Sequence, residues 1–179
     1  MKQISNGLAV SALAFSLSLS LAACGGEPEA PVEVAEGDCP PGISVSEGWM
    51  VLPAVEGNPG AVYFTLANDS ERQVTIRSAS VLGAESAMMH ETSSWNLQDD
   101  MQEIFTLAVM PGQSEKFEPG RKHVMAMGIG EGVAEGAETE VTLTFVGGDK
   151  CSFSVESFAA GQTPEWFEGT PPEQESEEG

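Results

Sequence analysis

The sequence predicts an all-β fold, a single sandwich or barrel of about 120 residues. Three observations predict it. Short runs of alternating apolar residues recur between 39 and 161, turn-forming Gly, Pro, Asn and Asp separate these runs, and no convincing amphipathic helix interrupts them. The whole chain has 179 residues, which is enough for one domain with a hydrophobic core. We therefore expect residues 39–161 to form one β domain.

The expected strands can be followed in order along this region. The runs that alternate or are rich in β-forming residues are 62–66, 74–83, 104–109, 122–129, 141–145 and 151–155. Val141, Leu143 and Phe145 share one face of their run, because side chains alternate along a strand. Gly147-Gly148-Asp149 stands between the last two runs and is typical of a hairpin turn.

The residues before 39 are expected to be a lipoprotein signal peptide, 1–23, and an acidic linker, 24–38. An uncharged apolar stretch, 8–23, is about 16 residues long, which is shorter than the roughly 20 that span a bilayer. It ends in Leu21-Ala22-Ala23-Cys24, which resembles a bacterial lipobox and predicts cleavage before a lipid-modified Cys24. An ordinary export signal is the alternative. The linker has five acids and no base, which favours an extended chain.

The end of the chain is also expected to lie outside the fold. Residues 162–179 carry six acids, no base and three prolines, which predicts a disordered acidic tail. Trp166-Phe167 within it could dock on the domain or on a partner. The formal net charge of the chain is −21, and nucleic-acid binding, which needs a basic surface, is therefore excluded.

Cysteine usage predicts one disulfide. The chain has three cysteines, so a lipid-modified Cys24 would leave Cys39 and Cys151 as a pair in an oxidising compartment. Such a bond closes a loop of about 110 residues, for which the chain-entropy model assigns on the order of 4–5 kcal/mol. The alternative is that the two thiols bind metal, but no C-x-x-C or Cys-x-His pattern surrounds either one.

Histidine and methionine gather in one part of the chain. His90 and His123 are the only histidines, and six of the eight methionines lie between 88 and 127. His123 and Met125 are two residues apart in an expected strand, and so are Met88 and His90, so each pair shares a face. Imidazole and thioether ligands together favour the soft ion Cu(I), whereas zinc prefers thiolate, imidazole or carboxylate.

The spacing of four of these residues is specific. His90, Met101, His123 and Met125 form the pattern H-x10-M-x21-H-x-M, which resembles the motif of the periplasmic copper chaperones of the PCu(A)C family. Segments 60–68, 89–92 and 118–125 are similar to other parts of that family. The resemblance implies a cupredoxin-like, Greek-key β-sandwich in which these four residues bind Cu(I). It also implies delivery to a copper-accepting periplasmic protein, such as a cytochrome c oxidase subunit or its assembly factor.

The chain departs from the family in three respects. Arg121 stands where the family usually has a second glycine, and its cationic side chain could tune access to His123. The tail lacks the His- and Met-rich extension of several members, and the lipobox is not a general family feature. Two smaller questions stay open: Met88 and Met127 could be auxiliary ligands or a hydrophobic rim, and Glu91 could orient His90.

The sequence therefore predicts a copper(I)-binding protein rather than an enzyme, lipid-anchored in the cell envelope and facing the periplasm. No nucleophile–base constellation is evident. An electron-transfer cupredoxin would need a thiolate beside imidazoles, and neither Cys39 nor Cys151 has a histidine near it. Two alternatives remain open: a copper-sequestering lipoprotein without a dedicated acceptor, and a metal-free β-sandwich that serves as an interaction module.

Overall fold

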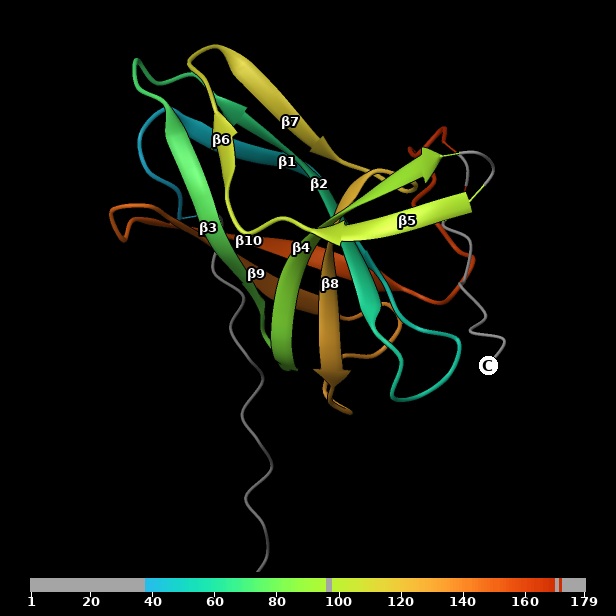
Figure 1. Ribbon diagram of the computed structural model, residues 1–179. Coiled ribbons are helices and arrows are strands. Elements are labelled where there is room, and N and C mark those ends of the chain that lie inside the picture. The colour runs from blue at the N-terminus through green and yellow to red at the C-terminus, as the bar shows by residue number, and fades with distance from the viewer. Residues whose placement is uncertain (1–37, 96–97, 170, 172–179) are drawn as a thin grey trace, which may run out of the picture. The chain divides into compact units, whose positions relative to one another are not determined.

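The chain folds into a ten-stranded β structure. The computed structural model describes residues 38–95, 98–169 and 171, and the expected signal peptide, Cys24 and the expected linker up to 37 lie outside them (Figure 1). The strands are β1 (Ile43–Val51), β2 (Gly60–Asn68), β3 (Val74–Val81), β4 (Ala84–Trp95), β5 (Gln98–Glu103), β6 (Leu107–Val109), β7 (Gln113–Phe117), β8 (Lys122–Ile129), β9 (Glu138–Phe145) and β10 (Lys150–Phe158). Within the described ranges, no helix has the length and apolar character needed to cross a bilayer.

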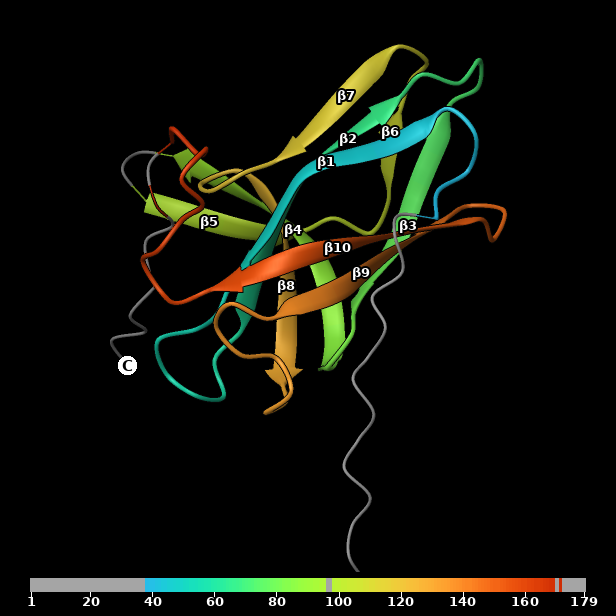
Figure 2. The ribbon, with the colours of Figure 1, turned by 180° about the vertical axis from the view of Figure 1, so that it is seen from behind.

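The strands form one sheet that curls on itself. Their order is β5-β4-β8-β2-β1-β10-β9-β3-β6. The remaining strand, β7, pairs with residues 64–68 of β2, on the same edge where β8 pairs with residues 60–62. All named pairs are antiparallel except β1 with β10. β3 and β4 are separated by five strands in this order but pack against each other, which turns the sheet into the expected sandwich (Figures 1 and 2).

The inner faces of nine strands enclose one hydrophobic core. The buried ring of Phe64 has its centroid 4.2 Å from that of Phe117 and 5.0 Å from that of Phe153. Val141, Leu143 and Phe145 all point into this core, as the alternation in their run predicts. The largest side chains with almost no exposed surface are Phe64, Met50, Leu66, Ile76, Leu143, Val62, Val109, Val124, Val141 and Val155.

A buried asparagine closes the end of the core. The side chain of Asn68 is fully buried, and its Nδ2 donates hydrogen bonds to the carbonyls of Arg72 and Val109, at 2.8 and 2.9 Å. Its Oδ1 accepts from the backbone and the hydroxyl of Ser70. Because a buried amide without partners costs free energy, this set of bonds ties the β2–β3 turn to β6.

One expected strand is shorter than its sequence run. The run 104–109 is a strand only over Leu107–Val109. Ile104 packs against the core and its N–H bonds the carbonyl of Met89 at 2.8 Å, while Phe105 is 72% exposed. The chain therefore leaves β5, anchors Ile104 inside and turns Phe105 outward before β6 starts, which breaks the alternation that a continuous strand requires.

Cys39 and Cys151 form a disulfide across the end of the fold. Their sequence separation is 112 residues, and the Cys151 side chain is fully buried. The N–H of Ser152 donates to the carbonyl of Asp38 at 3.0 Å beside it. The bond fastens the residues that precede β1 to the start of β10.

Part of the C-terminal segment packs on the domain. Phe167 lies with its ring 5.0 Å from that of Trp49, and Pro164 is buried. Of the two possibilities left open for Trp166-Phe167 in the expected tail, Phe167 docks on the domain, whereas Trp166 is 51% exposed. Phe167 thereby joins a second hydrophobic cluster, which consists of Trp49, Val51, Ala61, Tyr63, Phe158 and Phe167. Of the residues after 169, only Pro171 is described.

Candidate metal centre

The two histidines lie directly opposite each other on neighbouring strands. His90 in β4 pairs with His123 in β8, and their ring centroids are 6.0 Å apart at 66°. Directly paired residues of an antiparallel sheet project to the same side. Met89 and Val124, next to them in sequence, are buried in the core, so both imidazoles are on the outer face. The expected shared face of His123 and Met125 follows from the same alternation.

Met125 contacts His90, and Met101 lies nearby on β5. The Nδ1 atom of His90 is 2.6 Å from Sδ of Met125. β5 pairs with β4 so that Met101 stands opposite Thr92, two residues beyond His90 on the same face. Three adjacent strands, β5, β4 and β8, therefore present the four motif residues on one outer surface, although they are up to 35 residues apart in sequence.

A backbone carbonyl orients His123. Its Nδ1 is 2.9 Å from the carbonyl oxygen of Arg121, which can only accept, so Nδ1 carries the proton. Nε2 is then the ring nitrogen with a lone pair, as a metal ligand requires. Tyr63 flanks the imidazole at a centroid distance of 6.4 Å, and His123 is only 7% exposed. The sequence gives no signal for this orienting contact, because it depends on the course of the backbone.

The turn before β8 makes that contact possible. Gly120 has φ of 74°, a left-handed conformation that glycine adopts without steric cost. The N–H of Arg121 donates to the carbonyl of Glu118, and the Arg121 carbonyl also accepts the N–H of Thr92 at 3.2 Å. The Arg121 guanidinium lies 3.5 Å from Glu118, and the side chain is 74% exposed. Its backbone thus serves the site, while its charge is directed toward Glu118.

The carboxylate that stands opposite His90 is that of Glu103 and not that of Glu91. Glu91 lies on the opposite face from His90, 3.4 Å from the Lys122 ammonium, so it does not orient the imidazole. Glu103 of β5 instead pairs directly with His90 and is exposed. Strand alternation alone argues against Glu91, whereas Glu103 becomes a neighbour only through the register of β4 and β5.

The four motif residues offer neutral donor atoms, imidazole nitrogen and thioether sulfur. Across residues 38–95 and 98–169, no three His, Cys, Asp or Glu side chains are grouped as a metal ion would need. The two described cysteines are joined to each other. A metal at this surface would therefore rely on imidazole and thioether, the donor set that suits Cu(I).

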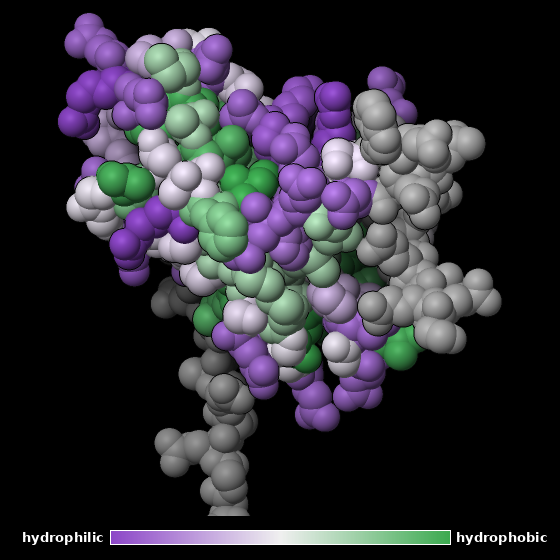
Figure 3. All heavy atoms as spheres, viewed as in Figure 1, coloured by the Kyte–Doolittle hydropathy of each residue, from purple (hydrophilic) through white to green (hydrophobic). Residues whose placement is uncertain are grey.

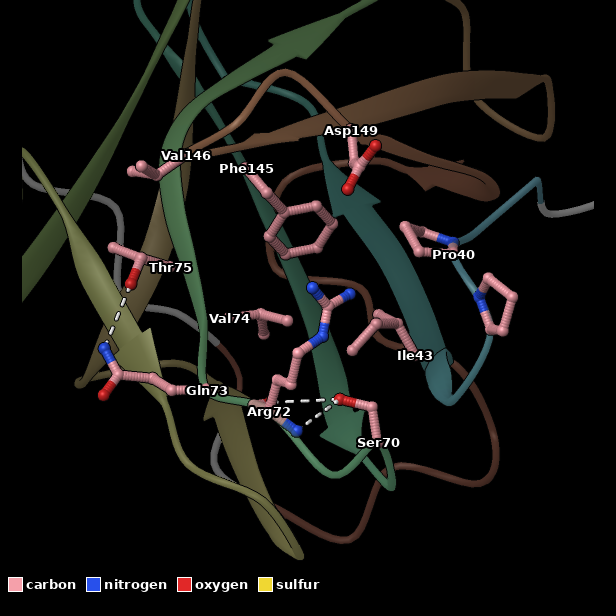
Figure 4. A pocket seen from close by; sticks show the side chains of 11 residues that line it. Pro40, Ile43, Ser70, Arg72, Gln73, Val74, Thr75, Phe145, Val146 and Asp149 are labelled. Atoms are coloured by element: carbon pink, nitrogen blue, oxygen red, sulfur yellow. Dashed lines mark hydrogen bonds between the residues drawn. The ribbon is translucent and has the colours of Figure 1, made fainter.

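A separate pocket lies at the other end of the sandwich (Figure 4). It holds about 200 Å³ and is lined by Ile43, Val74 and Phe145 among others, with the guanidinium of Arg72 extending into it. This volume is below the roughly 300–1,000 Å³ of typical small-molecule sites. Ile43 pairs with Asn68 at one end of β2 and Met125 pairs with Ala61 at the other, which puts about 23 Å between the two regions.

The fold is shared with solved structures. Solved structures with the same fold include the "Copper-bound PCuAC domain from PmoF2", 16% identical with a TM-score of 0.57, covering 70% of this chain and 99% of that domain. The "apo PmoF2 PCuAC domain" is 18% identical with a TM-score of 0.56, covering 70% and 95%. Apo-DR1885 from Deinococcus radiodurans is 18% identical with a TM-score of 0.50, covering 78% and 94%. This chain therefore has the cupredoxin-like β-sandwich fold of the PCuAC domains.

The sequence comparison then gives the family. Residues 43–157 match the family model "Putative lipoprotein LpqE-like", and the chain belongs to that LpqE-like family. A curated relative, "Putative lipoprotein Lxx21020" of Leifsonia xyli, is 28% identical over 115 residues, covering 64% of this chain and 68% of the relative. The matched region contains β1 to β9, most of β10 and all four motif residues.

Tyr63, which lies beside His123, should make the fold less stable at alkaline pH. Burial raises the pKa of its hydroxyl, so the folded chain holds this proton more tightly than the unfolded chain. The resulting stabilisation is complete below about pH 10 and is lost at about 1.4 kcal/mol per pH unit as the unfolded chain ionises above that value. Tyr63→Phe should therefore remove part of the alkaline loss of stability.

Denaturant unfolding at pH 9 and pH 11 checks this prediction. Because Tyr63 is the only tyrosine, tyrosinate absorbance should rise together with unfolding and not before it. The free-energy difference between wild type and Tyr63→Phe should change with pH. A difference that is the same at both pH values would contradict the prediction.

Proposed function

We propose that this protein binds one Cu(I) ion through His90, Met101, His123 and Met125 and carries it in the cell envelope. The observation that carries the proposal is the direct pairing of His90 with His123, with Met125 in contact with His90. Imidazole nitrogen and thioether sulfur match the softness of Cu(I). The copper named in the PmoF2 domain structure supports the same choice of metal.

The surroundings of the four residues suit a carrier. All donors are neutral, so a bound site keeps the single positive charge of the ion. His90, Met101 and Met125 are partly exposed, whereas His123 is buried. We infer that His123 is the last ligand to release the ion, and that an acceptor's ligands displace the three outer donors first.

The proposed location and acceptor rest on Cys24, on the acidic charge of the domain and on the family resemblance. We propose that Cys24 carries a lipid that anchors the protein facing the periplasm, in agreement with the lipoprotein name of the family. The domain residues 39–161 have 17 acids and six bases, so a basic face on the acceptor would be attracted at long range. An acceptor in cytochrome c oxidase assembly is the one that the family resemblance implies.

A competition titration tests the proposed metal site. The full chain, kept anaerobic with its disulfide intact, should take Cu(I) from a chelator of known affinity and should compete poorly for Zn²⁺. Met101→Leu preserves volume but removes the sulfur, so it should weaken Cu(I) binding by about tenfold or more. Met110→Leu is the matched control, since Met110 is exposed in the turn after β6. Equal Cu(I) affinity in both variants would reject Met101 as a ligand.

A further inference from the structure

The outer face of β4 and β8 continues past the histidine pair with more methionines. Met88 pairs directly with Met125, and each lies two residues along its strand from the histidine of the His90–His123 pair. Met127 follows on β8, opposite Ser86. The two strands therefore carry a row of two imidazoles, then two thioethers, then a thioether and a hydroxyl. Figure 3 shows moderately apolar surface over β4 and β8, bordered by hydrophilic residues.

Hydrophobic packing does not account for these methionines. Met88, Met101, Met125 and Met127 are all partly buried, yet neither hydrophobic cluster among the described residues includes any of them. Their neighbours on the inner face, Met89, Val124 and Ala126, fill the core instead. A methionine that belongs to no cluster and lies on an outer strand face leaves its sulfur available to a ligand.

Three of the sulfur atoms can reach a common point. Side chains directly opposite each other in an antiparallel pair have Cβ atoms about 4.5–5.5 Å apart, and diagonal neighbours about 7–8 Å apart. Met88 and Met125 are a direct pair, while Met88 and Met127 are diagonal. Methionine has three rotatable side-chain bonds, so all three thioethers can turn toward one ion between the strands. An all-thioether set is soft and selects Cu(I).

We propose that Met88, Met125 and Met127 form a second, weaker Cu(I) position beside the histidine site. It rests on the proposed function, because Met125 belongs to both positions. An incoming ion passes from this position to the histidine site by ligand exchange: Met125 keeps its bond, the bonds to Met88 and Met127 break, and bonds to His90, Met101 and His123 form. Copper stays Cu(I) throughout, so no oxidant or reductant takes part. The second position gives incoming copper a first place to bind before the buried His123 takes part.

Methyl NMR of the full chain, labelled with [ε-13C]methionine and titrated anaerobically with Cu(I), tests the proposal. The first equivalent should shift the methyl signals of Met101 and Met125. The second equivalent should shift those of Met88 and Met127, and Met125 again, because the two lone pairs of its sulfur let Met125 bridge both ions. Met88→Leu and Met127→Leu should each raise the Kd of the second step by about tenfold or more and leave the first unchanged. Met110→Leu should change neither step.

The outcomes separate the two proposals. A single binding step, or a second step indifferent to both Met88→Leu and Met127→Leu, overturns the second position while the histidine site stands. A first step that moves Met88 and Met127 but leaves Met101 unshifted contradicts the proposed function and supports thioether binding on its own. If no Cu(I) binds at all, both proposals are overturned.

Discussion

His123→Ala is expected to weaken Cu(I) binding by more than about 100-fold, the largest loss from any single substitution at this surface. Three features of His123 are not found together in any other proposed ligand. It is 7% exposed, its Nδ1 is held 2.9 Å from the Arg121 carbonyl, and Tyr63 lies against its ring. A preorganised ligand loses little freedom on binding, so its removal should cost more than the removal of a mobile one.

The expected order of effects provides an internal check. His90→Ala and Met101→Leu should weaken Cu(I) binding less than His123→Ala, because both side chains are more exposed. Tyr63→Phe is the matched control, since it alters the same neighbourhood without removing a proposed ligand. A chelator competition measures all four variants, with far-UV circular dichroism confirming that each is folded. If His123→Ala binds within tenfold of wild type, His123 is not the principal ligand.

Much of the fold could be predicted because it depends on local patterns. The run expected from 122 to 129 is β8 with the same limits, and the turn at 147–149 joins β9 to β10. The docking of Phe167 on Trp49 was left open, since it depends on which apolar surface remains uncovered after the strands assemble. The late start of the strand in the run 104–109 has the same origin, because Ile104 packs into a core built from distant strands.

The candidate site was predictable in composition but not in geometry. Alternation was enough to place His123 with Met125 and Met88 with His90, and the spacing of the motif selected the four residues. The register that sets His90 opposite His123 is a long-range property, fixed by pairing across 33 residues of chain. Glu103 could not be recognised as a neighbour of His90 without the register of β4 and β5. Glu91 illustrates the reverse error, since adjacency in sequence suggested a contact that the pleat of the strand prevents.

Loss of the disulfide is expected to have the largest effect on stability. Cys39→Ala should lower the free energy of unfolding by up to about 4–5 kcal/mol, because the bond closes a loop of 112 residues and restricts the unfolded chain. A loss of that size approaches the total stability of many domains, about 5–15 kcal/mol. Cys39 is the better position to change, since it is only partly buried whereas Cys151 is fully buried.

Urea unfolding with and without reductant isolates the contribution of the bond. Reductant should lower the stability of wild type toward that of Cys39→Ala and should leave the variant unchanged. Under native conditions, Cu(I) affinity should be the same in both proteins. Cys39 lies just before Ile43, which pairs with Asn68, and Asn68 is about 23 Å along β2 from Ala61, the partner of Met125. A variant that loses less than about 1 kcal/mol would mean that the unfolded chain is already restricted without the bond. A variant that stays folded but loses Cu(I) binding would mean that the two ends of the sandwich are coupled.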